Sequence, residues 1–327
     1  MDFLAIGDTV VDTFIKLKDA EVHCDIDNEH CTICMRFADK IPFESATVVP
    51  AVGNAANAAV AAARLGLKTA FIAGVGKDRD GADCIAQFKK ENISTDFITV
   101  KDGESTVNNY VLWYGNERTI LVKYAHFHYE LPAEMPSPRI VYLSAIGETN
   151  VALHDPIADW LEKNPKIRLA FQPGTFQISA GFKRLERIYK RSDILFANKE
   201  EYQRILGTAE EDIKKLMEIM HTKGPKTCVL TNGPEGAYSF DGNQALKIPA
   251  YPDPKPPYER TGAGDAFSST VAVALTLGKP LAEALTWGPI NSMAVVQYIG
   301  AQQGLLSRKI LEGYVEMAPE GYRATPL

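Results

Sequence analysis

The stretch VGNAANAAVAAARLGLKTAFIAGVG, residues 52–76, decides the fold of this chain. Residues 58–65 are rich in alanine and predict a closely packed helix, and Gly66 follows where a glycine commonly ends a helix. Residues 69–76 are a short apolar run with a glycine exit, which is typical of a buried strand. This alternation of helix and strand predicts a parallel sheet with right-handed crossovers.

The same alternation extends over most of the chain. Apolar runs with strand character precede helical segments at residues 3–8, 140–144, 168–172, 194–198 and 227–231. Two stretches of β-branched and aromatic residues, about 15–50 and 102–124, interrupt this order and predict strand-rich excursions. Near the C-terminus we expect two separate helices, at residues 281–287 and 290–298.

The composition bounds the protein's class. The net charge is −6 and no basic patch is present, so nucleic acid is not expected as the main partner. The N-terminus has no signal-peptide pattern and no stretch reaches the roughly twenty apolar residues that span a bilayer. We therefore expect a soluble cytoplasmic protein. Five cysteines, an odd number, argue against a disulfide framework.

The segment Arg260-Thr261-Gly262-Ala263-Gly264-Asp265 predicts a tight loop that opens a helix. The first N–H groups of a helix have no internal partner, and the helix dipole is positive there, so such a loop binds anions. Asp265 is unexpected at an anion site. Its carboxylate would suit a general base beside a phosphoryl-acceptor hydroxyl, or it would simply charge the start of the helix.

Cysteine and histidine cluster in the first excursion. Three thiols and two imidazoles occur within residues 23–34, and Cys31 and Cys34 have the spacing of a zinc half-site. Two interpretations stay open, a structural zinc site and ordinary small residues in a folded segment. The zinc ligands would be Cys24, Cys31, Cys34 and His30.

Several motifs in a fixed order resemble the pfkB family of carbohydrate and nucleoside kinases, over essentially the whole chain. The resemblance rests on residues 7–12, 53–57, 74–78, 198–201, 231–236, 261–265 and 300–302. It implies one ribokinase-like domain over residues 1–327: a three-layer α/β/α sandwich with a mainly parallel sheet and a β-rich lid. The two excursions correspond to the lid segments.

The resemblance implies roles for the residues of the transfer site. Asp265 would be the catalytic base, and the N–H groups of Gly262, Ala263 and Gly264 would form the anion hole for the γ-phosphoryl group. The acceptor hydroxyls would be bound by residues that follow the first strand or precede the alanine-rich helix. These are Asp12, Gly53, Asn57 and Asp8.

The resemblance also implies a site for ATP and Mg²⁺. Asn198 and Glu201 would organise the metal and the phosphates, partly through water. Thr231, Gly233 and Gly236 would contact the phosphates and the ribose. Glu259 replaces the aspartate that usually leads the Gly-Ala-Gly-Asp motif, and a monovalent cation such as potassium is expected near Glu259 and Gly300.

A lid would close over the acceptor and exclude water, and the resemblance implies a homodimer through this lid. Trp113, Tyr114 and Arg118 either reach the substrate or pack the lid hairpin.

We therefore expect an ATP-dependent kinase that phosphorylates a hydroxymethyl group of a sugar. The alternatives are a nucleoside kinase of the same family and a catalytically weak sugar- or nucleotide-binding regulator.

Overall fold

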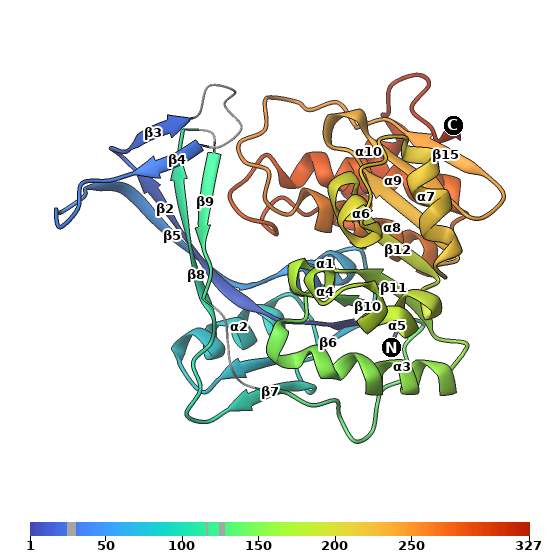
Figure 1. The fold of residues 1–327 in the computed structure, drawn as a ribbon, viewed down its shortest axis with the longest axis horizontal. Coiled ribbons are helices and arrows are strands. Elements are labelled where there is room, and N and C mark those ends of the chain that lie inside the picture. The colour runs from blue at the N-terminus through green and yellow to red at the C-terminus, as the bar shows by residue number, and fades with distance from the viewer. Residues whose placement is uncertain (25–30, 116, 124–127) are drawn as a thin grey trace.

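The computed structural model describes residues 1–24, 31–115, 117–123 and 128–327. These residues form a ten-stranded central sheet, a separate four-stranded sheet and a two-stranded hairpin. Helices cover both faces of the central sheet, and the smaller sheet projects to one side (Figure 1). The predicted α/β/α sandwich with a small β-rich lid is confirmed.

The central sheet is parallel except at one edge. Its strands are β1 (Phe3–Ile6), β6 (Thr69–Gly76), β7 (Ile98–Lys101), β10 (Ile140–Ser144), β11 (Arg168–Gln172), β12 (Ile194–Asn198), β13 (Thr227–Thr231), β14 (Ala237–Phe240), β15 (Ala245–Ile248) and β16 (Thr325–Pro326). Their order is β16-β15-β14-β13-β12-β11-β10-β1-β6-β7. The pairs from β13 to β16 are antiparallel, and the other pairs are parallel.

Successive side chains of each strand enter two different cores, because strand side chains alternate between faces. Phe3 and Ala5 of β1 belong to one core, and Leu4 and Ile6 belong to the other. The helices that cover these cores are α1 (Asn54–Arg64), α2 (Arg79–Lys90), α3 (His154–Lys163), α4 (Thr175–Ala180), α5 (Glu186–Arg191), α6 (Lys199–Leu206), α7 (Ile213–Thr222), α8 (Ala263–Thr276), α9 (Leu281–Val295) and α10 (Arg308–Glu316). Short 3₁₀ helices are η1 (Glu148–Leu153), η2 (Phe182–Leu185) and η3 (Gly233–Glu235).

The lid is the four-stranded sheet with its attached hairpin. Its strands are β2 (Val10–Leu17), β5 (Phe43–Val52), β8 (Asn108–Tyr114) and β9 (Glu117–Leu121), in the order β5-β2-β8-β9. The hairpin consists of β3 (Glu21–Cys24) and β4 (Cys31–Cys34). Because β2 begins only four residues after β1 ends, the lid is rooted at the carboxyl edge of the central sheet.

The two helices expected at residues 281–287 and 290–298 are instead one helix, α9, which continues through Pro289. Proline normally breaks a helix interior because it lacks the N–H donor. Here the segment is buried, and Gly288 lies so close to Phe267 that an added Cβ would be 2.6 Å from its Cδ2 atom. Packing of α9 against α8 therefore outweighs the local preference of the proline.

Within the described residues, no helix is both long enough and apolar enough to cross a membrane.

Gly7 lies where β1, β10 and α1 come closest, so we predict that Gly7→Ala destabilises the fold. An added Cβ would collide with the carbonyl oxygen of Ser144 and lie 2.7 Å from Cβ of Ala55. We expect a loss of about 1–3 kcal/mol in the free energy of unfolding, measured in urea.

The matched control is Gly313→Ala in α10, where an added Cβ meets nothing within 4 Å. This change should stabilise the helix by roughly 0.5–1 kcal/mol. Equal stability of the Gly7→Ala variant and the wild type would contradict the close approach.

Candidate active site

The predicted anion loop opens α8. Gly262 is the N-cap residue and has a left-handed backbone, with φ 78° and ψ 1°. A side chain there would also collide with Ala301, whose Cα would be 2.6 Å from the new Cβ. An added Cβ at Gly264 would meet nothing within 4 Å, so open space lies beside the first turn. The N–H groups of Gly262, Ala263 and Gly264 can therefore approach an anion closely.

Asp265 is the third residue of α8, and only 8% of its surface is exposed. Its carboxylate accepts hydrogen bonds from three neutral amides. Asn57 Nδ2 lies 2.8 Å from Oδ2, and Asn54 Nδ2 and Gln172 Nε2 lie 3.0 and 2.9 Å from Oδ1. Burial raises the pKa of Asp265, and the amide hydrogen bonds oppose this rise. Among the described residues, the side chains that bond to this carboxylate are therefore neutral amides.

Further contacts orient these amides. The hydroxyl of Tyr142 donates to Oε1 of Gln172. Nε2 of Gln302 donates to Oδ1 of Asn57 at 2.9 Å and to the carbonyl oxygen of Ala51 at 2.6 Å. Since the amide oxygens of Gln172 and Asn57 each accept a hydrogen bond, their NH₂ groups are turned toward Asp265.

Sequence reasoning did not assign Asn54, Gln172 or Tyr142 to the site. Gln172 ends a strand directly before a proline, and Asn54 begins a helix, so both occupy positions where ligand contacts are common. No pattern in the sequence marks Tyr142, because it lies within a fully buried strand.

The predicted acceptor residues lie between the sheet and the lid. Asp12 is in β2, and its Oδ1 accepts from Nδ2 of Asn109 in β8 at 3.1 Å. Burial raises the pKa of Asp12. Gly53 caps α1 with a φ of 114°, which only glycine adopts readily, and Asn57 follows one turn later. The structure thus places Asn57 against the predicted base.

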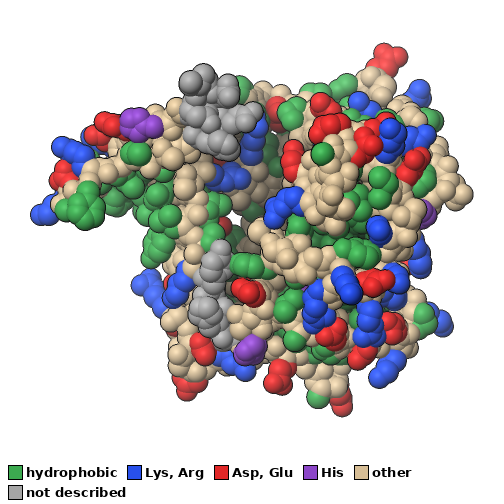
Figure 2. Space-filling model, in the orientation of Figure 1, with side chains coloured by type: hydrophobic (Ala, Val, Ile, Leu, Met, Phe, Trp, Pro, Cys, Tyr) green, Lys and Arg blue, Asp and Glu red, His purple; other side chains and the backbone are tan. Residues whose placement is uncertain are grey.

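A cavity of about 320 Å³ lies at the junction of the lid with the sheet. Asp8 lines this cavity, and Asp12 reaches its wall through Asn109. The lining residues are Asp8, Thr9, Val10, Gly74, Val107, Asn109, Val122, Lys123, Gly147, Glu148, Thr149, Asn150 and Phe176. The space-filling view is hollowed between the lid and the body of the molecule (Figure 2).

Asp8 is held by two donors. The hydroxyl of Tyr129 lies 2.9 Å from its Oδ1, and the N–H of Gly147 lies 2.7 Å from its Oδ2. Burial is the largest influence and raises the pKa of Asp8 to about 6, although both hydrogen bonds lower it.

The residues predicted to bind the nucleotide lie at the carboxyl ends of β12 and β13. Asn198 and Glu201 form a capping box on α6, with Asn198 Oδ1 2.8 Å from the N–H of Glu201 and Glu201 Oε2 2.9 Å from the N–H of Asn198. Asn198 pairs with Thr231 in the neighbouring strand. Gly233 and Gly236 both have positive φ values and form the turn around η3.

Glu201 interacts electrostatically with Asp265. Burial raises its pKa, and the negative charge of Asp265 raises it further. Oxygen donors of this kind suit a hydrated Mg²⁺ ion bound mainly by phosphates. Among the described residues, no group of three or more His, Cys, Asp or Glu side chains could hold a metal ion by itself.

Glu259 fixes the loop before α8. Its Oε1 accepts from the N–H of Gly300 at 2.7 Å. Its Oε2 accepts from the N–H of Thr261 at 3.2 Å, from the hydroxyl of Thr261 and from Nη1 of Arg118 at 2.9 Å. Glu259 and Gly300 are therefore together, as predicted for a cation site, but an arginine already pairs with the carboxylate.

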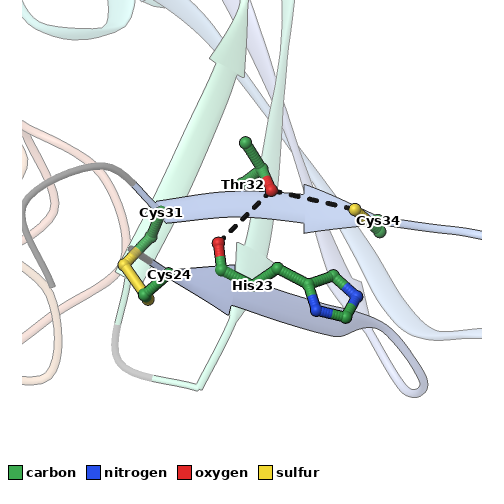
Figure 3. Close-up of a disulfide and its surroundings, with 5 residues drawn as sticks. All are labelled: His23, Cys24, Cys31, Thr32 and Cys34. Atoms are coloured by element: carbon green, nitrogen blue, oxygen red, sulfur yellow. Dashed lines mark hydrogen bonds between the residues drawn. A yellow bond between two sulfur atoms is a disulfide. The ribbon is translucent and has the colours of Figure 1, made fainter. Parts of the chain in front are cut away.

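The cysteines of the lid correct two expectations. Cys24 and Cys31 form a disulfide, although the cysteine count argued against such bonds (Figure 3). Cys31 and Cys34 are three residues apart in β4, so their side chains point to opposite faces and cannot share a zinc ion. His30 lies outside the described residues. Cys24 and Cys31 thus form a disulfide, so the structure does not favour the zinc interpretation of this cluster.

Comparisons with known proteins show the family and the fold of this chain. The model of the pfkB family of carbohydrate kinases matches residues 30–308. A nucleoside kinase of Methanothermobacter thermautotrophicus is 30% identical, covering 77% of this chain and 79% of that protein. A ribokinase of Haemophilus influenzae is 26% identical, and the match covers 81% of this chain and 87% of that protein.

Solved structures with lower identity share the fold. The nucleoside kinase of Methanocaldococcus jannaschii, described as an archaeal member of the ribokinase family, has a TM-score of 0.79 at 19% identity, covering 97% of this chain and 98% of that one. The ribokinase of Arabidopsis thaliana complexed with ribose and ATP also has a TM-score of 0.79, at 20% identity, covering 96% and 98%.

The raised pKa of Asp8 predicts a pH-dependent stability. A carboxyl group whose pKa is 3.8 in the unfolded chain and about 6 in the folded chain binds its proton more tightly when folded. The contribution of Asp8 to the free energy of unfolding is therefore complete below pH 3.8 and is lost as the pH rises to about 6. Asp8→Asn removes this titration, so between about pH 4 and about pH 7 the variant should gain up to about 3 kcal/mol relative to wild type.

Unfolding in urea across this pH range measures the difference. Asp159→Asn, an exposed change in α3, is the control and should leave the pH profile unchanged. A constant difference between Asp8→Asn and wild type at every pH would refute the raised pKa.

Proposed function

Because this chain belongs to the pfkB family of carbohydrate kinases, we propose that it transfers the γ-phosphoryl group of ATP to a hydroxymethyl group of a sugar, with Asp265 as the base. One observation carries this assignment. The carboxylate of Asp265 is buried beside a helix N-terminus and is bound only by neutral amides in the described contacts, so no described cation lowers its affinity for the proton it must accept.

The proposed step uses Asp265 and the anion loop together. Asp265 accepts the proton of the acceptor hydroxyl while the hydroxyl oxygen bonds to the γ-phosphorus, and the bond from that phosphorus to the β–γ bridging oxygen breaks, releasing ADP. The N–H groups of Gly262, Ala263 and Gly264 would stabilise the charge on the transferring group. The open space at Gly264 supports this role, since a phosphoryl group needs close approach to the backbone.

We assign acceptor binding to Asp12, Gly53, Asn57 and Asp8. A carboxylate at Asp12 and an amide at Asn57 suit vicinal hydroxyls, since both make paired hydrogen bonds. Asp8 lies at the cavity, and Asp12 bonds to Asn109, a lining residue of the same cavity, within the lid sheet. Lid closure would then remove water from the reacting groups.

We assign nucleotide binding to Asn198, Glu201, Thr231, Gly233 and Gly236. All five lie around the carboxyl ends of β12 and β13, and the electrostatic contact of Glu201 with Asp265 supports their place beside the phosphates. A bound Mg²⁺ ion would neutralise charge on the β- and γ-phosphates.

A nucleoside acceptor is the second candidate. The M. thermautotrophicus relative, called a nucleoside kinase, supports it, as does a cavity with apolar walls at Val10, Val107 and Val122 beside polar groups. The third candidate, a weak binding regulator, is disfavoured by the complete set of hydrogen bonds around Asp265.

Potassium at Glu259 and Gly300 does not fit the observed contacts well. Both carboxylate oxygens of Glu259 already accept hydrogen bonds, and Arg118 supplies a positive charge there. We derive no step that needs this ion.

We also propose a single cytoplasmic domain that dimerises through its lid. Hydrophobic side chains gather over the lid at the left of Figure 2. Val48, Tyr110 and Leu121 are exposed and lie on the same face of the lid sheet, because the strand register places them in one row. Burial of such side chains against a second copy would stabilise a dimer.

The kinase assignment predicts ADP formation that depends on both the acceptor and Asp265. Across a panel of sugars and nucleosides, wild type should form ADP with at least one acceptor. Asp265→Asn should lower kcat by ~10²–10⁴-fold, because the amide cannot accept the hydroxyl proton. Asp159→Asn is the control and should keep wild-type activity. No acceptor-stimulated ADP in wild type would favour the binding regulator, and a fully active Asp265→Asn variant would refute the base.

The dimer predicts a mass of two chains in light scattering after size-exclusion chromatography. Val48→Asp places a charge on the exposed apolar face and should give monomers. Ile310→Asp in α10 removes a similarly exposed side chain from another surface and should leave the dimer intact. A monomeric wild type would overturn this interface.

A further inference from the structure

Two lid residues contact two consecutive residues at the entrance to the anion loop. Trp113 and Arg118 are directly opposite each other across β8 and β9. The ring of Trp113 packs edge-on against Tyr258, with centroids 5.1 Å apart, and Nη1 of Arg118 lies 2.9 Å from Oε2 of Glu259. The end of the lid where β8 pairs with β9 is thus in contact with residues 258–259.

The Glu259 carboxylate joins three parts of the chain. It binds Thr261 in the anion loop, Gly300 in the loop after α9 and Arg118 in the lid. Gly262 packs on Ala301, the residue after Gly300, so the loops that Glu259 connects meet directly at the helix cap. The position of Glu259 therefore determines where the first N–H groups of α8 lie.

This carboxylate needs a cationic partner. Only 10% of the Glu259 side chain is exposed, and a buried charge is costly unless it is paired. Both partners also influence Asp12: the negative charge of Glu259 raises the pKa of Asp12, and the positive charge of Arg118 lowers it. Without Arg118, the buried carboxylate of Glu259 would lose the ion-pair partner whose Nη1 lies 2.9 Å from its Oε2.

We propose that Arg118 is a positioning residue for phosphoryl transfer, which acts through Glu259 to hold the anion loop when the lid is docked. The inference rests on the proposed function of that loop. It assigns to a side chain of the lid the positive charge that a bound monovalent cation would otherwise supply at Glu259. Lid docking and assembly of the anion hole are then one event.

Kinetics of variants test the coupling. Arg118→Gln should lower kcat by about 10- to 100-fold while the KM for the acceptor changes by less than about threefold, since misplacement of the loop affects the transition state. Arg118→Lys should recover part of the loss. In a chain that already carries Glu259→Gln, adding Arg118→Gln should lower kcat by less than about a further twofold, because the partner of the arginine is already lost. Arg36→Gln, which breaks an exposed lid ion pair with Asp39, is the matched control.

Chemical rescue separates positioning from a general loss of structure. Millimolar guanidinium ion should raise the kcat of Arg118→Ala at least about tenfold and leave wild type unchanged. Wild type should be equally active with potassium or choline as the monovalent cation. No rescue, or a wild type that requires potassium, would overturn the proposal.

Hydrogen exchange tests the contact without any activity. Amides of residues 258–264 and 299–302 should exchange at least about tenfold faster in Arg118→Gln than in wild type or in Arg36→Gln. Unchanged exchange overturns the inference even if the protein is an active kinase. Faster exchange in a protein that phosphorylates no acceptor would instead support the contact and reject the kinase assignment.

Discussion

The buried carboxylate of Asp265 is the constraint on which the rest of the site depends. An ionised carboxylate away from water is costly unless hydrogen bonds satisfy its oxygens. The donors come from α1 and β11, so these elements must hold fixed positions relative to α8. Neutral amides meet the requirement without neutralising the charge. That distinction matters for the proposed role of Asp265 as a base, because a cation on its carboxylate would lower its affinity for a proton.

The alanine-rich face of α1 makes this geometry attainable. Every residue from Ala55 to Ala62 is buried, and α1 packs against α8. Small side chains let the two helices approach closely enough for Asn54 and Asn57 to reach Asp265. The exit of β1 at Gly7 has the same character, since a side chain there would collide with β10 and α1. Close packing at one edge of the sheet thus gathers Asp265, the residues proposed to bind the acceptor and the root of the lid.

Local patterns predicted the layers of the fold because strand and helix periodicity reflects burial on one or two faces. Residues 69–76 were recognisable as a buried strand, and the motif from Gly262 to Asp265 as a helix start. Patterns failed where distant packing decides the outcome. Helix α9 continues through Pro289 because the residues around this proline are buried. Cys31 and Cys34 lie in a strand rather than in the turn that a zinc half-site requires. The pairing of Cys24 with Cys31 depends on the register of β3 with β4, which spacing does not reveal.

The sequence by itself determined the fold class and the family, because the alternation of strands and helices depends on local periodicity and the family is marked by motifs in a fixed order. Only the tertiary structure decided which side chains meet. Gln172 is 93 residues from Asp265, and Arg118 is 141 residues from Glu259, yet both pairs are within hydrogen-bonding distance. Such contacts follow from the order of strands and the docking of the lid. They are favoured because a buried charge is costly unless hydrogen bonds or an opposite charge satisfy it. No local pattern in the chain encodes that choice.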